Sequence, residues 1–145
     1  MARYSAGATS TNGGTAARPI GSLYAVAGVG GAIREIGVFN TTSTELAVRI
    51  ARLSTTGTQG TGLDEEKHDP NSATASCTAF NSHSADATVA AGSLARAQLG
   101  ASKGSGVIFT FGGDGLEIAA GTSNGIGIIP IGTGQVLEFY IIWDE

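Results

Sequence analysis

Few side chains of this sequence could take part in chemistry, and a single short run gathers several of them. Asp64-Glu65-Glu66-Lys67-His68-Asp69 combines carboxylates with an imidazole. Carboxylates at alternate positions could hold a hard cation, and His68 could join a transition-metal site. The run lacks the spacing of an EF-hand loop and contains a lysine, so a solvated loop explains it better than a metal site. We predict no metal here and retain Asp64, Glu65, Glu66 and His68 as candidate contact residues.

The other candidate nucleophiles and bases form no evident constellation. Cys77 and His83 would make a thiol–imidazole pair only if folding brought them together, and a lone cysteine is more often a small buried hydrophobe. The glycine cluster at 28–31 follows an apolar run, but Ile33 occupies the third glycine position of a dinucleotide fingerprint. We therefore predict no catalytic residue and no cofactor, and we expect a protein that is not an enzyme.

The charge balance narrows the range of partners. Eight lysines and arginines against twelve aspartates and glutamates give a formal net charge of −4. The cations are scattered and form no basic stripe, which argues against nucleic-acid binding. No apolar stretch is long enough to span a membrane, and the first residues lack the apolar core of a signal peptide. With Cys77 as its only cysteine, the chain suits a reducing compartment, so we expect synthesis in the cytoplasm.

Composition predicts one domain made of strands and turns. The chain has 145 residues, enough for one domain, and its 23 glycines make up about 16% of them, more than twice the usual share. Residues 1–19 are nearly all small or polar and include Arg3 and Arg18. Such a segment buries little apolar area, so we expect a flexible N-terminal arm, either frayed or ordered against a neighbouring subunit. Residues 20–145 form the domain.

Short apolar runs separated by glycine-bearing turns predict strands in the first two thirds of the domain. These runs are 23–27, 33–39, 78–80, 88–90 and 94–99. Strict alternation in 33–39 places Arg34 on the same face as Ile36 and Val38. Residues 46–53 alternate as a strand but also carry apolar residues at helical spacing, and the surrounding strands favour a strand. Residues 54–76 show no periodicity, and a connection this long is usually functional or disordered.

The C-terminal third predicts two hairpins. Runs 107–111 and 116–119 flank one glycine-rich turn, and runs 126–131 and 136–143 flank another. In the last run Phe139 and Trp143 share a face expected in the core. Tyr140 and Ile142 share the other face, which is unusually apolar for solvent and therefore suggests an interface. About eight short strands in all predict an all-β antiparallel β-sandwich that is jelly-roll-like.

Four stretches resemble a known class of proteins: Gly115–Gly125, Gly132-Thr133-Gly134-Gln135, the ending Tyr140–Glu145 and the upstream Ile33–Phe39. They are similar to small β-sandwich virion proteins of tailed bacteriophages, including head decoration (cement) proteins. The resemblance covers residues 20–145 and rests on glycine and aliphatic patterns. It implies a jelly-roll-like domain that binds the outer capsid lattice, often as a trimer, and strengthens it against internal DNA pressure. It carries over no catalytic residue.

We therefore expect a structural virion protein on the capsid surface, a decoration protein that forms a homotrimer and binds the lattice of the major capsid protein. Its candidate interface residues are Tyr140, Ile142, Asp64, Glu65, Glu66, His68, Arg3 and Arg18. The alternatives are a phage tail, neck or fibre component and a carbohydrate-binding jelly-roll module. If the arm serves assembly, deleting residues 1–19 should weaken association and leave the sandwich folded.

Overall fold

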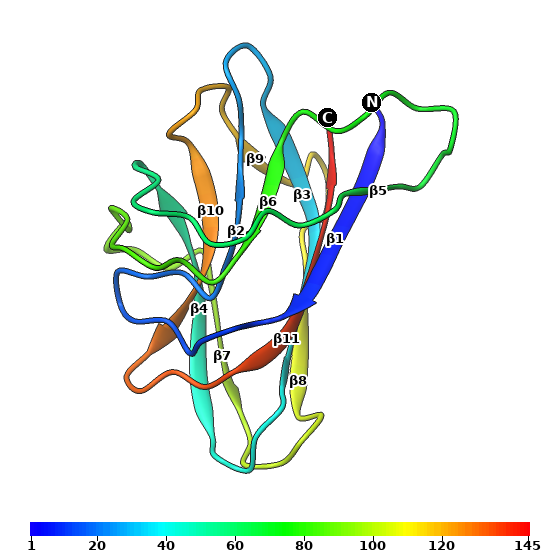
Figure 1. Cartoon of the computed structure of the whole chain (residues 1–145). Coiled ribbons are helices and arrows are strands. Elements are labelled where there is room, and N and C mark those ends of the chain that lie inside the picture. The colour runs from blue at the N-terminus through cyan, green and yellow to red at the C-terminus, as the bar shows by residue number, and fades with distance from the viewer.

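The computed structural model describes residues 1–145, and its regular elements are eleven β-strands arranged in two antiparallel sheets (Figure 1). The first sheet has the order β5 (Glu66–Lys67), β1 (Arg3–Thr9), β11 (Leu137–Asp144), β3 (Gly31–Asn40) and β8 (Gly106–Thr110), and β9 (Leu116–Ile118) pairs with the start of β3. The second sheet has the order β6 (Thr78–Asn81), β2 (Gly21–Tyr24), β10 (Gly125–Ile131), β4 (Leu46–Leu53) and β7 (Ala95–Leu99). No helix is present that could cross a membrane.

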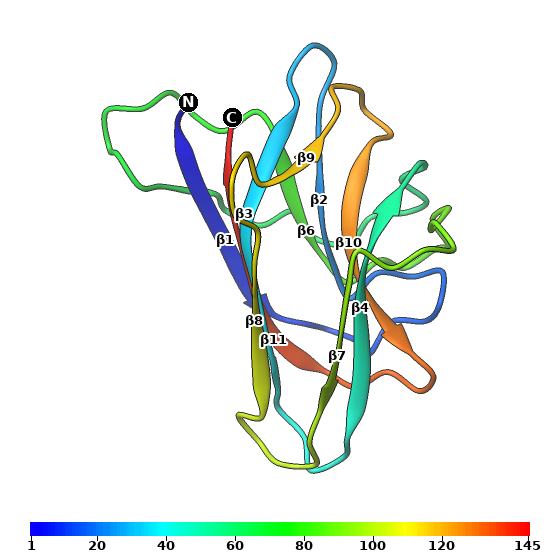
Figure 2. The ribbon, with the colours of Figure 1, turned by 180° about the vertical axis from the view of Figure 1, so that it is seen from behind.

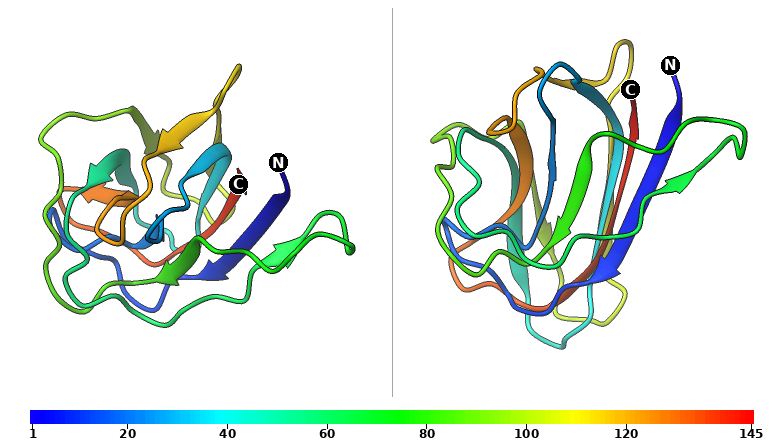
Figure 3. Two further views of the ribbon diagram at one scale, coloured as in Figure 1. Left: turned by 90° about the horizontal axis from the view of Figure 1, so that it is seen from above. Right: turned by 45° about the horizontal axis from the view of Figure 1, so that its top comes forward.

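The strand order is that of a jelly roll. The antiparallel pairs β1–β11, β2–β10, β3–β8 and β4–β7 lie alternately in the first and the second sheet. Rolling up a long ribbon of these four pairs gives β1-β11-β3-β8 packed over β2-β10-β4-β7. Figure 3 shows the two layers, and Figure 2 shows the edge where β8 and β7 lie side by side. The prediction of an antiparallel, jelly-roll-like β-sandwich is confirmed. The two predicted hairpins are wrong, because β8 and β9 both pair with β3 instead of with each other, and β10 and β11 lie in different sheets.

The core lies between the two sheets. Phe139 and Trp143 of β11 point into it and are buried, as their alternation predicts. Residues 46–53 form the strand β4, and the inward positions Val48 and Ile50 are fully buried. The strand interpretation of this ambiguous segment is therefore confirmed. Its helical spacing is coincidental, because hydrogen bonding to β10 and β7 on both edges fixes it as a central strand.

Residues 1–19 do not form a flexible arm, so that prediction is wrong. Arg3–Thr9 lies between β11 and β5 and stays in register with β11 along its whole length. Tyr4 faces the core, and its ring stacks on Trp143 with 5.8 Å between the ring centroids. Pairing with β11 along its whole length, and with β5 at its start, holds this strand in the sheet although it has few large apolar side chains. Composition alone underestimates the order of such a segment.

Strand β3 departs from strict alternation. Ile142 pairs with Glu35 but Trp143 pairs with Ile33, so Arg34 is an extra residue in a β-bulge. Both Ile33 and Ile36 therefore face the core. The prediction that Arg34 shares a face with Ile36 is wrong, and its guanidinium instead binds the carboxylate of Asp144, with 2.6 Å between Nε and Oδ2.

The outer face of the second sheet is covered by the chain's own loops. Its outward apolar side chains join Ala87 in a second buried cluster made of Tyr24, Ala51, Leu53, Ala87 and Ile129. Segments 54–60 and 82–93 lie over this cluster and are fastened to it, for example by the Tyr24 hydroxyl, which donates to the Thr55 carbonyl at 2.9 Å. Residues 88–90 contribute one bridge, Leu53↔Val89, and no strand. The loops thus provide this face with its own solvent-excluding cover.

Candidate functional site

The outer face of the first sheet carries no comparable cover, and no loop crosses it in the ribbon views (Figure 3). Residues on this face oppose one another directly across the strands, for example in the row Gly7, Tyr140, Gly37 and Ile108. We call the apolar part of this surface the open face and define it as Phe39, Ile108, Tyr140 and Ile142. Ile108 is 50% exposed, and the other three side chains are half-buried. The open face is therefore an apolar patch in contact with solvent.

Two glycines keep the open face flat. A Cβ at Gly37 would overlap the Tyr140 ring, and a Cβ at Gly106 would overlap the Phe39 ring. Each aromatic ring therefore lies across the neighbouring strand at a position without a side chain, and the two rings stack with centroids 6.4 Å apart. Aromatic side chains that lie over strand glycines are a known way to stabilise such positions. The result is a smooth surface of rings lying against the sheet.

The Tyr140 hydroxyl anchors its ring at the polar margin of the open face. It donates a hydrogen bond to Glu35 Oε1 at 2.5 Å. Burial and the neighbouring carboxylate raise the pKa of Tyr140 to about 12, so the hydroxyl stays protonated near neutral pH. The ring is therefore held at one end by the Glu35 carboxylate and along its length by Gly37.

A groove of about 340 Å³ lies beside the open face, along β1. We call it the β1 groove; its lining is Ser5, Ala6, Gly7, Asp64, Glu66, His68, Tyr140 and Ile142. The outward positions of β1 in this stretch are Ser5, with a small side chain, and Gly7, with none, so they leave space between β11 and the segment around β5. Two apolar side chains thus face two carboxylates and an imidazole across a floor of small residues.

Five of the eight interface candidates from the sequence meet in the β1 groove: Asp64, Glu66, His68, Tyr140 and Ile142. Three have other environments. Glu65 turns to the opposite side of its segment and accepts a hydrogen bond from the Ala79 amide at 3.1 Å. The guanidinium of Arg3 binds Asp144 at 2.7 Å, and that of Arg18 binds Asp86 at 2.7 Å beside the cover of the second sheet. The eight residues therefore do not form one continuous surface.

The signal that would have separated these residues is the period of two along β5. Asp64, Glu66 and His68 alternate with Glu65 and Lys67, and successive side chains of an extended segment point to opposite sides. Reading 54–76 as lacking periodicity concealed this pattern. The sequence gives no signal for Ser5 and Gly7, which form the floor, because the small and polar composition of residues 1–19 predicts an arm.

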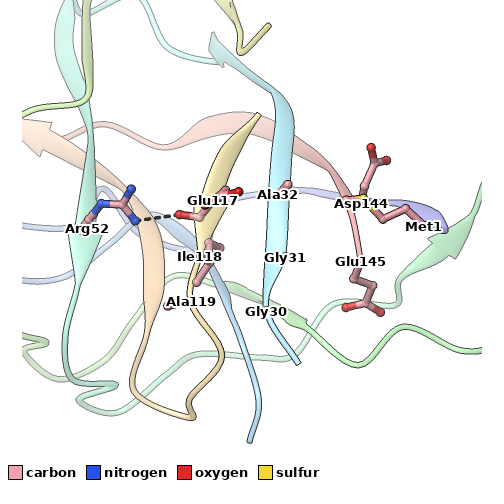
Figure 4. Close-up of a pocket in the computed structure, with 10 residues that line it drawn as sticks. All are labelled: Met1, Gly30, Gly31, Ala32, Arg52, Glu117, Ile118, Ala119, Asp144 and Glu145. Carbon is pink, nitrogen blue, oxygen red and sulfur yellow. Dashed lines mark hydrogen bonds between the residues drawn. The ribbon is translucent and has the colours of Figure 1, made fainter. Parts of the chain in front are cut away.

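A larger concavity of about 440 Å³ lies near the two chain ends (Figure 4). Three of its charged side chains, Arg52, Asp144 and Glu145, are engaged within the chain. Arg52 donates to the Glu117 carbonyl at 2.8 Å, and the Glu145 carboxylate accepts from the backbone amides of Ser76 and Cys77. Asp144 binds the guanidinium groups of both Arg3 and Arg34, which together with its other contacts hold the pKa of this carboxyl below its usual value. Contacts within the fold therefore account for these charged groups.

Buried reactive side chains are placed for packing. The Cys77 thiol lies in the core, where burial and Glu145 raise its pKa to about 12. His83 is fully buried, its Nε2 lies 2.8 Å from Ser22 Oγ, and burial lowers its pKa to about 4. The run Gly121–Gly125 has the form Gly-x-Ser-x-Gly, but a nucleophile elbow joins a strand to a helix and this run joins β9 to β10. No group of three or more His, Cys, Asp or Glu side chains is arranged to hold a metal ion.

Comparisons with protein-family models, with curated proteins and with solved structures found no match for this chain. The surface features that bear on its function are the open face and the β1 groove, with the chemistry of their side chains.

Proposed function

We propose that this protein is a structural virion protein that binds a repeating protein lattice through its open face, and that it acts as a capsid decoration protein on the outside of a phage head. The observation that carries the proposal is the difference between the two outer faces of the sandwich. The outward apolar side chains of the second sheet are buried under segments of the same chain, whereas those of the open face meet solvent.

The composition of the open face supports a role in protein association. An apolar centre with Phe39, Ile108 and Tyr140 is bordered by polar residues, among them Glu35 and Glu138. Protein interfaces have this organisation, with aromatic residues enriched in the centre and polar groups at the rim. Contiguous exposed apolar surface on a folded domain generally marks a contact site. The flat, glycine-backed rings also lose little conformational freedom on binding.

A decoration protein needs only modest affinity at each contact, because the contact is repeated many times over the lattice. In the proposed homotrimer, three open faces would engage the lattice of the major capsid protein at once, so weak individual contacts would add up to firm attachment. A tail, neck or fibre component could use the same face, and the partner particle used in the binding assay separates these possibilities. A carbohydrate-binding role for Trp143 is unsupported, because this side chain is fully buried.

The experiment compares two exposed aliphatic residues on different parts of the surface. Ile108 lies on the open face and is 50% exposed, whereas Leu94 lies in the loop before β7 and is 42% exposed. We expect Ile108→Ser to weaken co-sedimentation with empty phage heads by about tenfold, as loss of a central interface side chain does, and Leu94→Ser to bind as wild type does. Sedimentation velocity without heads measures the oligomer. Wild-type protein that stays in the supernatant with heads, or equal binding by both variants, would contradict the proposal.

A further inference from the structure

The β1 groove carries two carboxylates that nothing in the chain neutralises. Asp64 and Glu66 are exposed, and neither carboxylate takes part in any hydrogen bond or ion pair of the structure. The neighbouring cations, Lys67 in the same segment and Arg3 on the paired strand β1, are occupied. Lys67 donates to the Ser72 carbonyl at 3.0 Å, and Arg3 holds Asp144. The wall formed by Asp64 and Glu66 therefore presents free negative charge to whatever enters the groove.

The opposite wall is apolar. Ile142 and Tyr140 of β11 line this side, and the Tyr140 ring leans away from β1 over Gly37 of β3, where its hydroxyl binds Glu35. Between the walls, Gly7 pairs directly with Tyr140 in the sheet, and a Cβ at Gly7 would come within 2.9 Å of the Phe139 carbonyl oxygen. The floor therefore stays low, and a side chain of a partner can lie along β1 between the two walls.

The two walls together select a ligand that is cationic at one end and apolar along its length. An arginine side chain has this form: its guanidinium pairs with carboxylates and stacks on aromatic rings, and its methylene groups pack against aliphatic surface. A neutral sugar would need hydrogen-bond donors as well as acceptors, and here the donors are confined to Ser5 and His68. The unpaired charge of the groove therefore favours a cation over a carbohydrate.

We propose that the β1 groove receives an arginine side chain from the protein partner that docks on the open face. The guanidinium lies between Asp64 and Glu66, and its methylene groups contact Ile142 and Tyr140 along the β11 side of the groove. This inference rests on the proposed function, because the groove shares Tyr140 and Ile142 with the open face. The inference specifies that the partner presents a positive charge, and it predicts that binding weakens as the ionic strength rises.

The test uses a defined probe, the peptide acetyl-Ala-Leu-Arg-Leu-Ala-amide, and the same peptide with citrulline in place of arginine. Citrulline has nearly the same shape and no charge. Titrations of the full-length protein are followed by NMR at the Tyr140 ring and at the amides of Ser5 and Gly7. We expect saturable shifts with the arginine peptide and weak, non-saturating shifts with the citrulline peptide. The double variant D64N/E66Q should weaken arginine-peptide binding about fivefold, since each exposed ion pair contributes modestly.

A matched variant controls for net charge. Glu45 and Asp114 are exposed and make no side-chain hydrogen bond or ion pair, so E45Q/D114N removes the same charge away from the groove. It should bind the arginine peptide as wild type does. Equal weakening by both double variants, equal binding of both peptides, or the same NMR shifts on addition of methyl glucoside would overturn the arginine site.

Binding to phage heads separates this inference from the proposed function. If D64N/E66Q binds heads as tightly as wild type while Ile108→Ser does not, the open face keeps its role and the arginine site is wrong. If D64N/E66Q binds heads more weakly and loses its salt dependence, both proposals are supported. If no variant on this side changes head binding, the open face itself is not the contact.

Discussion

Acidification from pH 7 to pH 4 is expected to destabilise the fold by about 3 kcal/mol through His83 alone. This ring is fully buried, stacks on Tyr24 and lies 2.8 Å from the Ser22 hydroxyl through its Nε2 atom. Burial lowers its pKa from the ordinary 6.5 to about 4. Each pKa unit of difference between the folded and unfolded states corresponds to about 1.4 kcal/mol, so the shift from 6.5 to about 4 corresponds to about 3 kcal/mol.

The direction follows from where the proton binds. Between pH 6.5 and pH 4 the unfolded chain protonates this histidine and the folded chain does not, so protons favour the unfolded state. The stability associated with a neutral His83 is therefore fully present above pH 6.5 and is lost as the pH falls towards 4. Since domains of this size have total stabilities of about 5–15 kcal/mol, the loss is readily measured.

The assay is urea unfolding followed by the fluorescence of Trp143, the only tryptophan, at several pH values between 4 and 7. His83→Gln keeps a polar group near Ser22 and cannot titrate, so its stability should fall by about 3 kcal/mol less than that of wild type over this range. A His83→Gln variant with the same pH slope as wild type would refute the reasoning.

Three further predictions concern the fold. Asp144→Asn should lower the free energy of unfolding at pH 7 by about 1–3 kcal/mol, because its two arginine partners lose a charged acceptor; urea unfolding measures this, and the difference from wild type should shrink progressively as the pH falls below 3.8. Gly37→Ala should cost about 1–3 kcal/mol by displacing the Tyr140 ring, whereas Gly112→Ala, with open space around it, should be nearly neutral. Deleting residues 1–10 removes β1 from the sheet and should abolish cooperative unfolding monitored by circular dichroism; a truncated chain that still unfolds cooperatively would show that β1 is dispensable.

The sequence predicts those strands whose own side chains are half apolar. β11 alternates over its whole length, and its inward and outward residues are placed correctly. β1 has the opposite character: Arg3–Thr9 carries only Tyr4 as a large core residue, and it is a strand because its backbone pairs with β11 along its whole length and with β5 at its start. Such tertiary pairing leaves almost no trace in composition.

The candidate site was predictable in part. Tyr140 and Ile142 follow from an outward face that is too apolar for solvent. The grouping of Asp64, Glu66 and His68 opposite them depends on β5 pairing with β1, which local sequence does not reveal. The engagement of Arg3 with Asp144 likewise depends on two strands from opposite ends of the chain lying side by side.

Solvent-accessibility footprinting of the protein bound to empty phage heads, read out by mass spectrometry, tests the role of the open face most directly. Phe39, Ile108 and Tyr140 should become protected from hydroxyl-radical labelling on binding, while the exposed Met1 and Leu94 remain labelled as in the free protein. Protection confined to the loops over the second sheet, or labelling of Ile108 that is unchanged in the bound particle, would contradict the central claim that the uncovered face of the first sheet is the binding surface.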